Sequence, residues 1–276
     1  MNENFDSILT SVQNDKVKHW ASLLDKKNRD RSGQFLIEGV HLVLEALKGN
    51  ADVATIVYDT ERGIPAELKH ERETNDSEAT LGLEWVQASR SVMTKCTGTD
   101  TPPPVFAVVS KLKADKRTLF GAHCLVVVLD GVRDPGNAGT IIRSADAVGA
   151  DAVIFGKGCV DLYNPKTVRS TMGSLFHLPV IEGDLIELLP MAKAKGVKVI
   201  GTSLQAKHTC YSYDWTQPTW LLMGNESEGL SEKVRQQVEE SVIIPMVGQA
   251  ESLNVAMAAT ICLYEGLRQR KYVNGI

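Results

Sequence analysis

An apolar run, Leu125 to Leu129, constrains the fold more than any other feature of the sequence, and it ends in Asp130. A strand with one face in water alternates apolar and polar side chains, whereas a strand that is apolar at every position is buried on both faces. Such strands lie at the centre of parallel sheets that are covered by helices on both sides. The run therefore predicts the middle of a parallel α/β domain.

The rest of the chain repeats this alternation of strand-like and helix-like segments. After the run, we expect strands at 152–155, 197–201, 220–223 and 242–244, and helices at 138–148, 166–171, 185–194, 231–239 and 253–270. Before it, a βαβ-like rhythm runs through 35–37, 40–47, 54–58 and 105–109. A chain of 276 residues is also longer than a typical single domain. The pattern predicts two α/β domains.

A proline-rich loop and a charged stretch separate the two halves. Gly98 to Pro104 ends in successive prolines, which lack backbone donors and cannot continue a helix. The charged stretch Lys111 to Arg117 is the better linker candidate. We therefore expect a smaller N-terminal domain over 1–112, a linker over 113–121 and a larger domain over 122–276.

Composition excludes several classes of protein. The chain is 43% hydrophobic and 23% charged, and no apolar run approaches the length of a membrane span. Its polar, acidic start has no secretory pattern, so we expect a cytoplasmic protein with no membrane partner. Five widely spaced cysteines and six scattered histidines predict reduced thiols and no metal site. With a net charge of −4, RNA binding would need a local basic patch.

Two of the loops that follow predicted strands concentrate polar residues. Ligands of open parallel sheets bind at the carboxyl ends of the strands, which is where these loops lie. In the first, an Asp-Pro-Gly-Asn turn delivers Asn137 to the start of a helix, and Arg143 follows one and a half turns later. In the second, Gly224 and Gly229 flank Glu226, and glycine there would let a ligand approach the backbone.

A third loop leaves the strand near Ile243 through proline and glycine and enters a helix with Ser252 or Asn254 as N-cap. Taken alone, each of the three loops has an ordinary explanation as a turn or a cap. All three, however, are expected at the same edge of one sheet, which predicts a shared pocket. The glycine motifs of NAD- and ATP-binding proteins are absent from the sequence, as are the common hydrolase and zinc-protease motifs.

These loops carry a family resemblance. Asp130 to Ala145, Leu222 to Leu230 and Ile244 to Gln269 resemble, in order and spacing, the three motifs of the SpoU or TrmH-like ribose methyltransferases of the SPOUT superfamily. Gly33 to Gly39, followed by a helix, looks like the substrate-binding domain of the ribosomal RNA members, which is similar in fold to a small RNA-binding ribosomal protein. The resemblance covers most of the chain.

The resemblance implies an enzyme that methylates a ribose 2′-hydroxyl of RNA, most of all 23S ribosomal RNA, with S-adenosylmethionine as donor. It also implies a deep trefoil knot in the C-terminal domain, which general topology rules would reject, and a homodimer whose subunits complete each other's sites. Carried over by motif, the residues that hold the donor are Gly224, Ile244, Met246 and Leu253. The residues that face the ribose and carry catalysis are Asn137, Arg143, Glu226, Ser252 and Asn254. No metal is required.

The role of Arg143 follows from charge. Family accounts make this arginine a general base, yet a guanidinium with a pKa above about 12 is a poor proton acceptor near neutral pH. We therefore favour a role in which Arg143 stabilises the developing alkoxide and fixes a neighbouring phosphate.

RNA recruitment is predicted for Lys16 to Arg31, which holds six basic residues against two acidic ones. Trp20 within it would stack a base, although a solvated amphipathic helix explains the segment equally well. The residues expected to bind RNA are Lys16, Lys26, Lys27, Arg29 and Arg31.

Three alternatives stay open at the sequence level. The first is the same chemistry on transfer RNA, against which the Phe35-containing N-terminal domain argues. The second is a catalytically silent RNA-binding or ribosome assembly factor, although intact Asn137, Arg143, Glu226 and Asn254 argue against it. The third is an antibiotic-resistance methylase of the same architecture, which no residue distinguishes.

Overall fold

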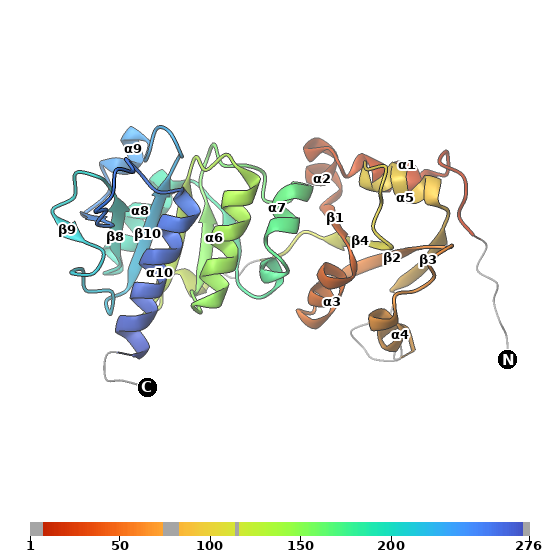
Figure 1. Ribbon diagram of the computed structural model, residues 1–276, viewed down its shortest axis with the longest axis horizontal. Helices are drawn as coiled ribbons and strands as arrows, with labels where there is room; N and C mark the ends of the chain where they lie inside the picture. Colours follow the sequence, from red (N-terminus) through yellow and green to blue (C-terminus); the bar gives the residue numbers. More distant parts are fainter. Residues whose placement is uncertain (1–7, 74–82, 114–115, 273–276) are drawn as a thin grey trace. The chain divides into compact units, whose positions relative to one another are not determined.

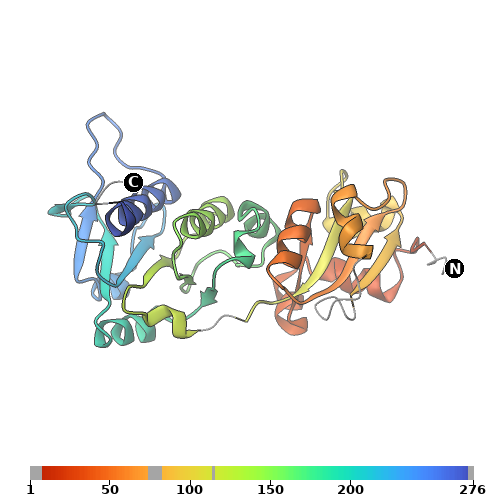
Figure 2. The ribbon, with the colours of Figure 1, turned by 90° about the horizontal axis from the view of Figure 1, so that it is seen from below.

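The computed structural model describes residues 8–73, 83–113 and 116–272, and the chain divides into two compact units (Figures 1 and 2). Unit 1 consists of Met1–Lys113 together with Tyr163–Phe176, and unit 2 consists of Ala114–Leu162 together with His177–Ile276. The expected linker, 113–121, includes residues 114–115, which lie outside the described residues. Its role as a linker stays a prediction.

A mixed sheet of four strands forms the centre of unit 1, in the order β1-β4-β2-β3. Strand β4 is antiparallel to both of its neighbours, whereas β2 and β3 are parallel. The expected βαβ rhythm is present, because α3 connects β1 to β2. The elements are β1 (Gln34–Glu38), α3 (Val40–Lys48), β2 (Val53–Asp59), α4 (Ala66–Glu73), β3 (Glu84–Ala88), α5 (Arg90–Thr97) and β4 (Val105–Ser110).

Two short helices precede this sheet, in the basic segment for which an amphipathic helix was the alternative to an RNA-binding patch. Helix α1 (Asp15–Ser22) begins at Asn14, whose side chain accepts the Lys16 N–H over 2.9 Å. Helix α2 (Lys26–Ser32) begins at Asp25 in the same way, over 2.8 Å to the Lys27 N–H. Because the side chain of Asp25 caps a new helix there, the two helices are separate.

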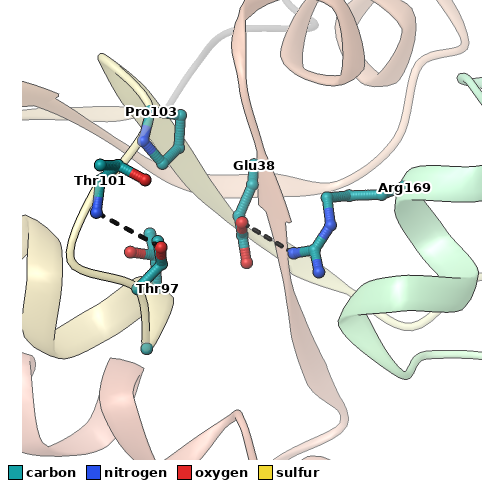
Figure 3. Close-up of a pocket in the computed structure, with 7 residues that line it drawn as sticks. Glu38, Thr97, Thr101, Pro103 and Arg169 are labelled. Atoms are coloured by element: carbon teal, nitrogen blue, oxygen red, sulfur yellow. Dashed lines mark hydrogen bonds and ion pairs between the residues drawn. The ribbon is translucent and has the colours of Figure 1, made fainter.

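The segment 163–176 packs with unit 1, although the sequence analysis placed it in the C-terminal domain. It contains α7 (Pro165–Ser170) and a 3-10 turn, η3 (Ser174–Phe176). The Tyr163 ring lies 4.6 Å from the buried Phe35 ring, centroid to centroid. Arg169 on α7 donates to Glu38 at the end of β1 over 2.9 Å (Figure 3). Aromatic packing and an ion pair therefore attach this segment to β1.

Unit 2 is built on a sheet in which all seven strands pair in parallel, in the order β7-β6-β5-β10-β8-β11-β9. Strand β5 (Leu125–Asp130) lies between β6 and β10, and every residue of it is buried. This confirms the position predicted from its apolar run. The other strands are β6 (Ala152–Phe155), β7 (Val180–Glu182), β8 (Lys198–Thr202), β9 (His208–Thr209), β10 (Thr219–Gly224) and β11 (Glu240–Ile243).

The helices of unit 2 mostly follow the sequence prediction. Helix α8 (Leu185–Ala194) has the predicted bounds, and α6 (Pro135–Ala147) and α10 (Val255–Lys271) lie within three residues of theirs. Helix α9 (Glu232–Arg235) is much shorter than the helix expected over 231–239, because the chain leaves it in a turn and the Glu239 N–H already donates to the Val199 carbonyl of β8. A 3-10 helix, η2 (Lys116–Phe120), precedes β5. The α/β class with a parallel sheet is confirmed, and the knot stays a prediction.

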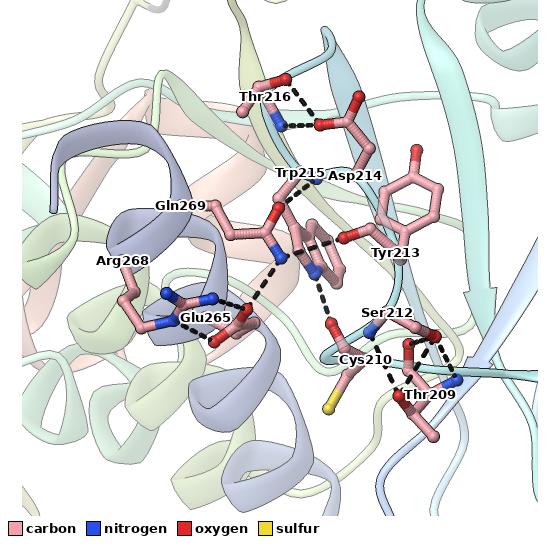
Figure 4. A network of polar contacts seen from close by, with 10 residues as sticks. All are labelled: Thr209, Cys210, Ser212, Tyr213, Asp214, Trp215, Thr216, Glu265, Arg268 and Gln269. Atoms are coloured by element: carbon pink, nitrogen blue, oxygen red, sulfur yellow. Dashed lines mark hydrogen bonds and ion pairs between the residues drawn. The ribbon is translucent and has the colours of Figure 1, made fainter. Parts of the chain in front are cut away.

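Helix α10 is anchored at its C-terminal half by polar side chains (Figure 4). Gln269 donates to the Tyr213 carbonyl over 3.0 Å and accepts the Trp215 N–H, also over 3.0 Å. The Arg270 guanidinium donates to four backbone carbonyls, those of His123, Cys124, Trp215 and Gln217. This end of α10 is therefore fixed against the chain that precedes β5 and β10, and the helix carries its other end to the candidate site.

Candidate active site

Three of the predicted site residues meet in one hydrogen-bond network. Asn137 lies in the first turn of α6, Glu226 in the loop after β10, and Asn254 at the N-cap of α10. Asn137 Nδ2 donates to Glu226 Oε1 over 2.9 Å, and Asn254 Nδ2 donates to Asn137 Oδ1 over 2.9 Å. The prediction that the three loops share one edge of the sheet is confirmed for these residues, which we call the Asn137 network.

The network fixes which way each amide points. Asn254 Oδ1 caps α10 by accepting the N–H groups of Ala256 and Met257, so its Nδ2 must face Asn137. Asn137 then presents its oxygen to Asn254 and its nitrogen to Glu226. Each amide nitrogen carries two hydrogens, and among the described residues only one acceptor is recorded for each. Two oriented N–H donors are therefore left over for a ligand.

Glu226 is a well-satisfied carboxylate at the surface. Partial burial raises its pKa, but hydrogen bonds from the Asn137 amide and from the backbone N–H groups of Arg133 and Asp134 outweigh that effect, so the net pKa is lowered. The carboxylate is consequently ionised at neutral pH and is a weak base. Its position supports a role in holding Asn137 rather than in removing a proton.

A stripe of polar residues on α6 faces α10. Asn137 contacts Asn254, and seven residues later Ser144 is 2.7 Å from Thr260, oxygen to oxygen. Two views show the helices side by side (Figures 1 and 2). Arg143 lies six residues beyond Asn137, about 120° around the helix and about 9 Å along it. It is exposed, and no polar contact to the Asn137 network is recorded in the described structure.

The loop that carries Glu226 is packed tightly on Gly224. A Cβ at Gly224 would lie 2.2 Å from the Gly229 carbonyl carbon and 2.4 Å from the Leu230 nitrogen. The loop closes on itself, because Asn225 and Gly229 exchange both of their backbone hydrogen bonds. We expected Gly224 to let a ligand approach the backbone, but the loop itself fills the space beside the Gly224 α-carbon. The role of Gly224 in holding a cofactor stays a prediction.

The segment between β11 and α10 contains the other predicted cofactor residues. Ile244 and Met246 are half-buried, Leu253 is 40% exposed, and Ser252 is exposed without a recorded polar contact. Within the described chain, no hydrogen bond between backbone groups involves residues 246–253. Such a run of uncommitted donors and acceptors fits a nucleoside ligand that is held by backbone groups. The residues present therefore suit a cofactor such as S-adenosylmethionine.

An open pocket of about 540 Å³ lies against Glu226. Both loops that line it were singled out in the sequence, but of its residues only Glu226 was predicted as a site residue, although Asp134 carries a recognisable signal. An aspartate directly before proline at a helix start is a typical N-cap, and its carboxylate accepts the Asn137 N–H over 2.7 Å. The lining residues are Arg133, Asp134, Pro135, Asn225, Glu226, Ser227 and Glu228.

The basic segment of unit 1 agrees only in part with its prediction. Lys26 and Lys27 are exposed, as are Lys16 and Arg31. Arg29, however, is 2% exposed and donates to the Leu23 carbonyl over 2.7 Å. Trp20 is 3% exposed and packs edge-on against Phe106. The predictions that Arg29 binds RNA and that Trp20 stacks a base are wrong for this fold, because both side chains belong to the interior.

Three further predictions concern disulfides, a metal site and a membrane-spanning helix, all of which were expected to be absent. All five cysteines are free thiols, and burial raises the pKa of Cys96 to about 12. Over the ranges that the structure describes, no group of three or more His, Cys, Asp or Glu side chains could hold a metal ion. In the same ranges, no helix combines the length and apolar character needed to cross a bilayer.

Comparison with known proteins identifies the family. The family model of the SpoU rRNA methylase family matches residues 124–264, and that of the MRM3-like substrate binding domain matches residues 14–107. The chain belongs to the SpoU rRNA methylase family. The first match contains Asn137, Glu226 and Asn254, and the second contains the basic segment and the four-stranded sheet up to the first half of β4.

Two curated relatives match almost the whole chain. The 23S rRNA (guanosine(2553)-2′-O)-methyltransferase RlmP of Bacillus subtilis is 39% identical over 256 residues, which is 93% of this chain and 97% of that protein. The 23S rRNA (uridine(2479)-2′-O)-methyltransferase of Streptomyces viridochromogenes is 37% identical over 267 residues, which is 94% of this chain and 91% of that protein. Both domains of the chain are therefore present in these relatives.

Solved structures of similar methyltransferases align with almost the whole chain. The crystal structure of the SpoU methyltransferase AviRb from Streptomyces viridochromogenes in complex with AdoMet aligns with a TM-score of 0.83 and 34% identity, covering 96% of this chain and 100% of that one. An AdoMet-bound rRNA methyltransferase from Sinorhizobium meliloti aligns with a TM-score of 0.82 and 33% identity, covering 94% of this chain and 97% of that one.

Proposed function

We propose that this chain transfers a methyl group from S-adenosylmethionine to a ribose 2′-hydroxyl of ribosomal RNA, with 23S rRNA as the substrate. The Asn137 network is the observation that carries the proposal, since it presents two oriented N–H donors beside a segment of uncommitted backbone. Membership of the SpoU family, and relatives named as 23S rRNA 2′-O-methyltransferases, support the reaction and the RNA.

The chemistry divides between the cofactor and the side chains. When bound, S-adenosylmethionine supplies an electrophilic methyl group, and Gly224, Ile244, Met246 and Leu253 would hold it. Asn137 and Asn254 direct N–H groups at the ribose oxygens, which aligns the attacking hydroxyl and disperses charge that develops on it. Glu226 fixes Asn137, and Ser252 lies two residues before Asn254, where it would contact the same ribose.

Arg143 would act as an electrostatic stabiliser. Its position away from the Asn137 network argues against direct proton transfer within that network, and its guanidinium is a poor base. Arg143→Lys should therefore slow methyl transfer without moving the pKa of the pH-rate profile under single-turnover conditions. A profile whose pKa shifts with the side chain would instead support the general-base role.

A homodimer would complete the site. The exposed side of α10 carries Met257 and Tyr264, which are 55% and 50% exposed, and it continues into Leu253 beside the Asn137 network. Apolar side chains along one helix face suit a second copy of the chain. Met257→Glu should convert a dimer to monomers in sedimentation experiments, whereas Met191→Glu, on the equally exposed Met191 of α8, should not. A wild-type monomer would contradict the proposal.

RNA recruitment would use the exposed lysines and Arg31 of the basic segment. Reversing the charge at Lys26 and Lys27 should weaken RNA binding, with little effect on cofactor affinity. The cytoplasm is the expected location, and the knot of the SpoU family is expected in unit 2.

Methylation of total RNA tests the function. Ribose methylation is mapped by primer extension on ribosomal and transfer RNA from a strain that lacks the gene, and the lost stop should return with the wild-type gene but not with Asn137→Ala. A site in transfer RNA would replace the proposed substrate. If no stop is lost, the chain is an RNA-binding assembly factor of the same family.

A further inference from the structure

A second carboxylate pocket, distinct from the Asn137 network, lies within unit 1. It encloses about 380 Å³ and is larger than a nucleobase. Glu38, at the end of β1, lies between Arg169 of α7 and the loop that follows α5 (Figure 3). Its lining residues are Glu38, Thr97, Gly98, Thr99, Thr101, Pro103 and Arg169. None of them belongs to the site described above.

The Glu38 side chain is 8% exposed, yet only half of its carboxylate is satisfied. Oε2 accepts from Arg169 over 2.9 Å, whereas Oε1 is buried and has no hydrogen-bond partner among the residues that the structure describes. Burial raises the pKa of Glu38, and the positive charge of Arg169 opposes that effect without cancelling it. A buried carboxylate oxygen without a donor is costly, because desolvation is not compensated. An ion pair that only attached α7 to β1 would not require this open oxygen.

The facing wall of the pocket is held in place. Pro102 and Pro104 are fixed through their carbonyls, which accept from the Arg62 guanidinium over 3.2 Å and from the Asp59 N–H over 2.9 Å. Between them the Pro103 ring lines the pocket, and the Thr101 N–H donates to the Thr99 hydroxyl over 3.3 Å. The wall is therefore shaped before any ligand arrives, which lowers the entropic cost of binding.

The Glu38 carboxylate accepts hydrogen bonds, so it distinguishes the RNA bases by the donors on their edges. A carboxylate accepts two hydrogen bonds side by side, and guanine places two donors, N1–H and the N2 amino group, next to each other on its Watson–Crick edge. The edges of adenine, cytosine and uracil put an acceptor beside their donor, which a carboxylate repels. Such an edge is accessible in single-stranded loops, where sequence-specific proteins read RNA bases.

We propose that the pocket of Glu38 and Arg169 binds an unpaired guanine of the RNA substrate, with one of its two donors, N1–H and the N2 amino group, on Oε1 and the other on the second lone pair of Oε2, which also accepts from Arg169. Arg169 is 45% exposed and keeps further N–H donors for a phosphate of the same strand. The Pro103 ring offers an apolar surface to the base. This inference rests on the proposed function, since it assigns a recognition site to the RNA of that reaction.

Nucleotide binding to the full chain tests the pocket without methyl transfer. Guanosine 5′-monophosphate is titrated at millimolar concentrations against inosine, adenosine and uridine 5′-monophosphates, with nuclear magnetic resonance as the readout. Inosine keeps N1–H but lacks the N2 amino group. The wild-type chain should prefer the guanosine nucleotide by about ten- to a hundredfold, the usual discrimination of a bidentate base contact. Equal binding of all four nucleotides, or no binding, overturns the proposal.

Two variants keep the test decisive. Glu38→Gln should abolish the preference for guanosine over inosine, and Thr101→Trp should block the pocket without touching the ion pair. Asp52→Asn, which changes an exposed carboxylate of the same unit that accepts from the Ser110 hydroxyl, is the matched control and should bind like the wild type. Retained preference in both pocket variants contradicts the proposal.

The same preparations are assayed for S-adenosylmethionine binding and for methyl transfer to ribosomal RNA. A chain that methylates RNA but does not select guanosine refutes the pocket alone. A chain that selects guanosine but transfers no methyl group refutes the proposed function and leaves the pocket as an RNA-binding site.

Discussion

Glu226 and Glu38 are two carboxylates that end or follow strands of two different sheets, and their surroundings differ in kind. Glu226 is exposed and receives N–H donors from Asn137, Arg133 and Asp134, which lowers its pKa. Glu38 is buried, Arg169 is its one donor in the described part of the chain, and its pKa is raised. A carboxylate that is already satisfied holds its neighbours in place, whereas one with an open oxygen has capacity left for a ligand. The following experiments test this difference.

The largest effect is expected where the loop of Glu226 rests on Gly224. Gly224→Ala would bring its Cβ to 2.2 Å from the Gly229 carbonyl carbon, so the loop must move and Glu226 with it. Methyl transfer should fall below detection, and overpacking should lower the free energy of unfolding by about 1–3 kcal/mol. Gly121→Ala is the control, because a Cβ there lies 3.9 Å from the Cys124 Cβ, an ordinary contact, and Gly121 is outside the candidate site. Similar losses in both variants would show that the tight packing of Gly224 is irrelevant.

A smaller effect is expected when only the charge of Glu226 is removed. Glu226→Gln keeps the size of the side chain, but both carboxylate oxygens accept N–H groups, so whichever way the amide turns its –NH2 group faces another donor. The loop should shift and Asn137 with it, and single-turnover methyl transfer should fall by about a hundredfold, the usual cost of a small misplacement of reacting groups. Glu228→Gln changes the neighbouring exposed carboxylate of the same pocket and should be nearly neutral. Equal rates in the two variants would remove Glu226 from the site.

Asn254 both caps α10 and belongs to the Asn137 network, and two matched variants distinguish these roles. Asn254→Ala should lower the free energy of unfolding by about 1 kcal/mol, because it removes the cap. It should also slow methyl transfer by about tenfold, the equivalent of one hydrogen bond. Asn14→Ala removes a similar cap from α1 in unit 1 and should cost similar stability without slowing the reaction. Loss of activity in both variants would mean that stability alone explains the effect.

The sequence was most informative where periodicity and turn chemistry act locally. The apolar run of β5 predicted its central place, because burial on both faces allows no polar residue. The meeting of Asn137, Glu226 and Asn254 was predictable, since the carboxyl ends of parallel strands share one edge. The specific amide orientations were not, because they depend on the cap of α10 and become visible only when all three loops are placed.

Long-range packing explains what the sequence analysis missed. Trp20 and Arg29 look like surface residues in a basic segment, yet Trp20 packs against Phe106 of β4 and Arg29 donates to the Leu23 carbonyl between the two helices. The Glu38 pocket joins β1 to residues more than 50 positions away, and Arg169 comes from a segment that the motifs assigned to the other domain. No periodic pattern records such contacts, because they arise from tertiary structure.

The smallest expected effect is on the pH dependence of stability, to which the two carboxylates should contribute with opposite signs. The lowered pKa of Glu226 contributes stability above the ordinary carboxyl range, and that contribution is lost as pH falls through the pKa in the folded state. The raised pKa of Glu38 gives the opposite behaviour, since its contribution is complete below the ordinary pKa and is lost as pH rises through the folded one. Urea titrations from acidic to neutral pH should therefore show that the stability of the wild type relative to Glu226→Gln increases with pH. Its stability relative to Glu38→Gln should decrease with pH. If both differences change in the same direction, the two carboxylates do not differ in the way that their hydrogen-bond partners indicate.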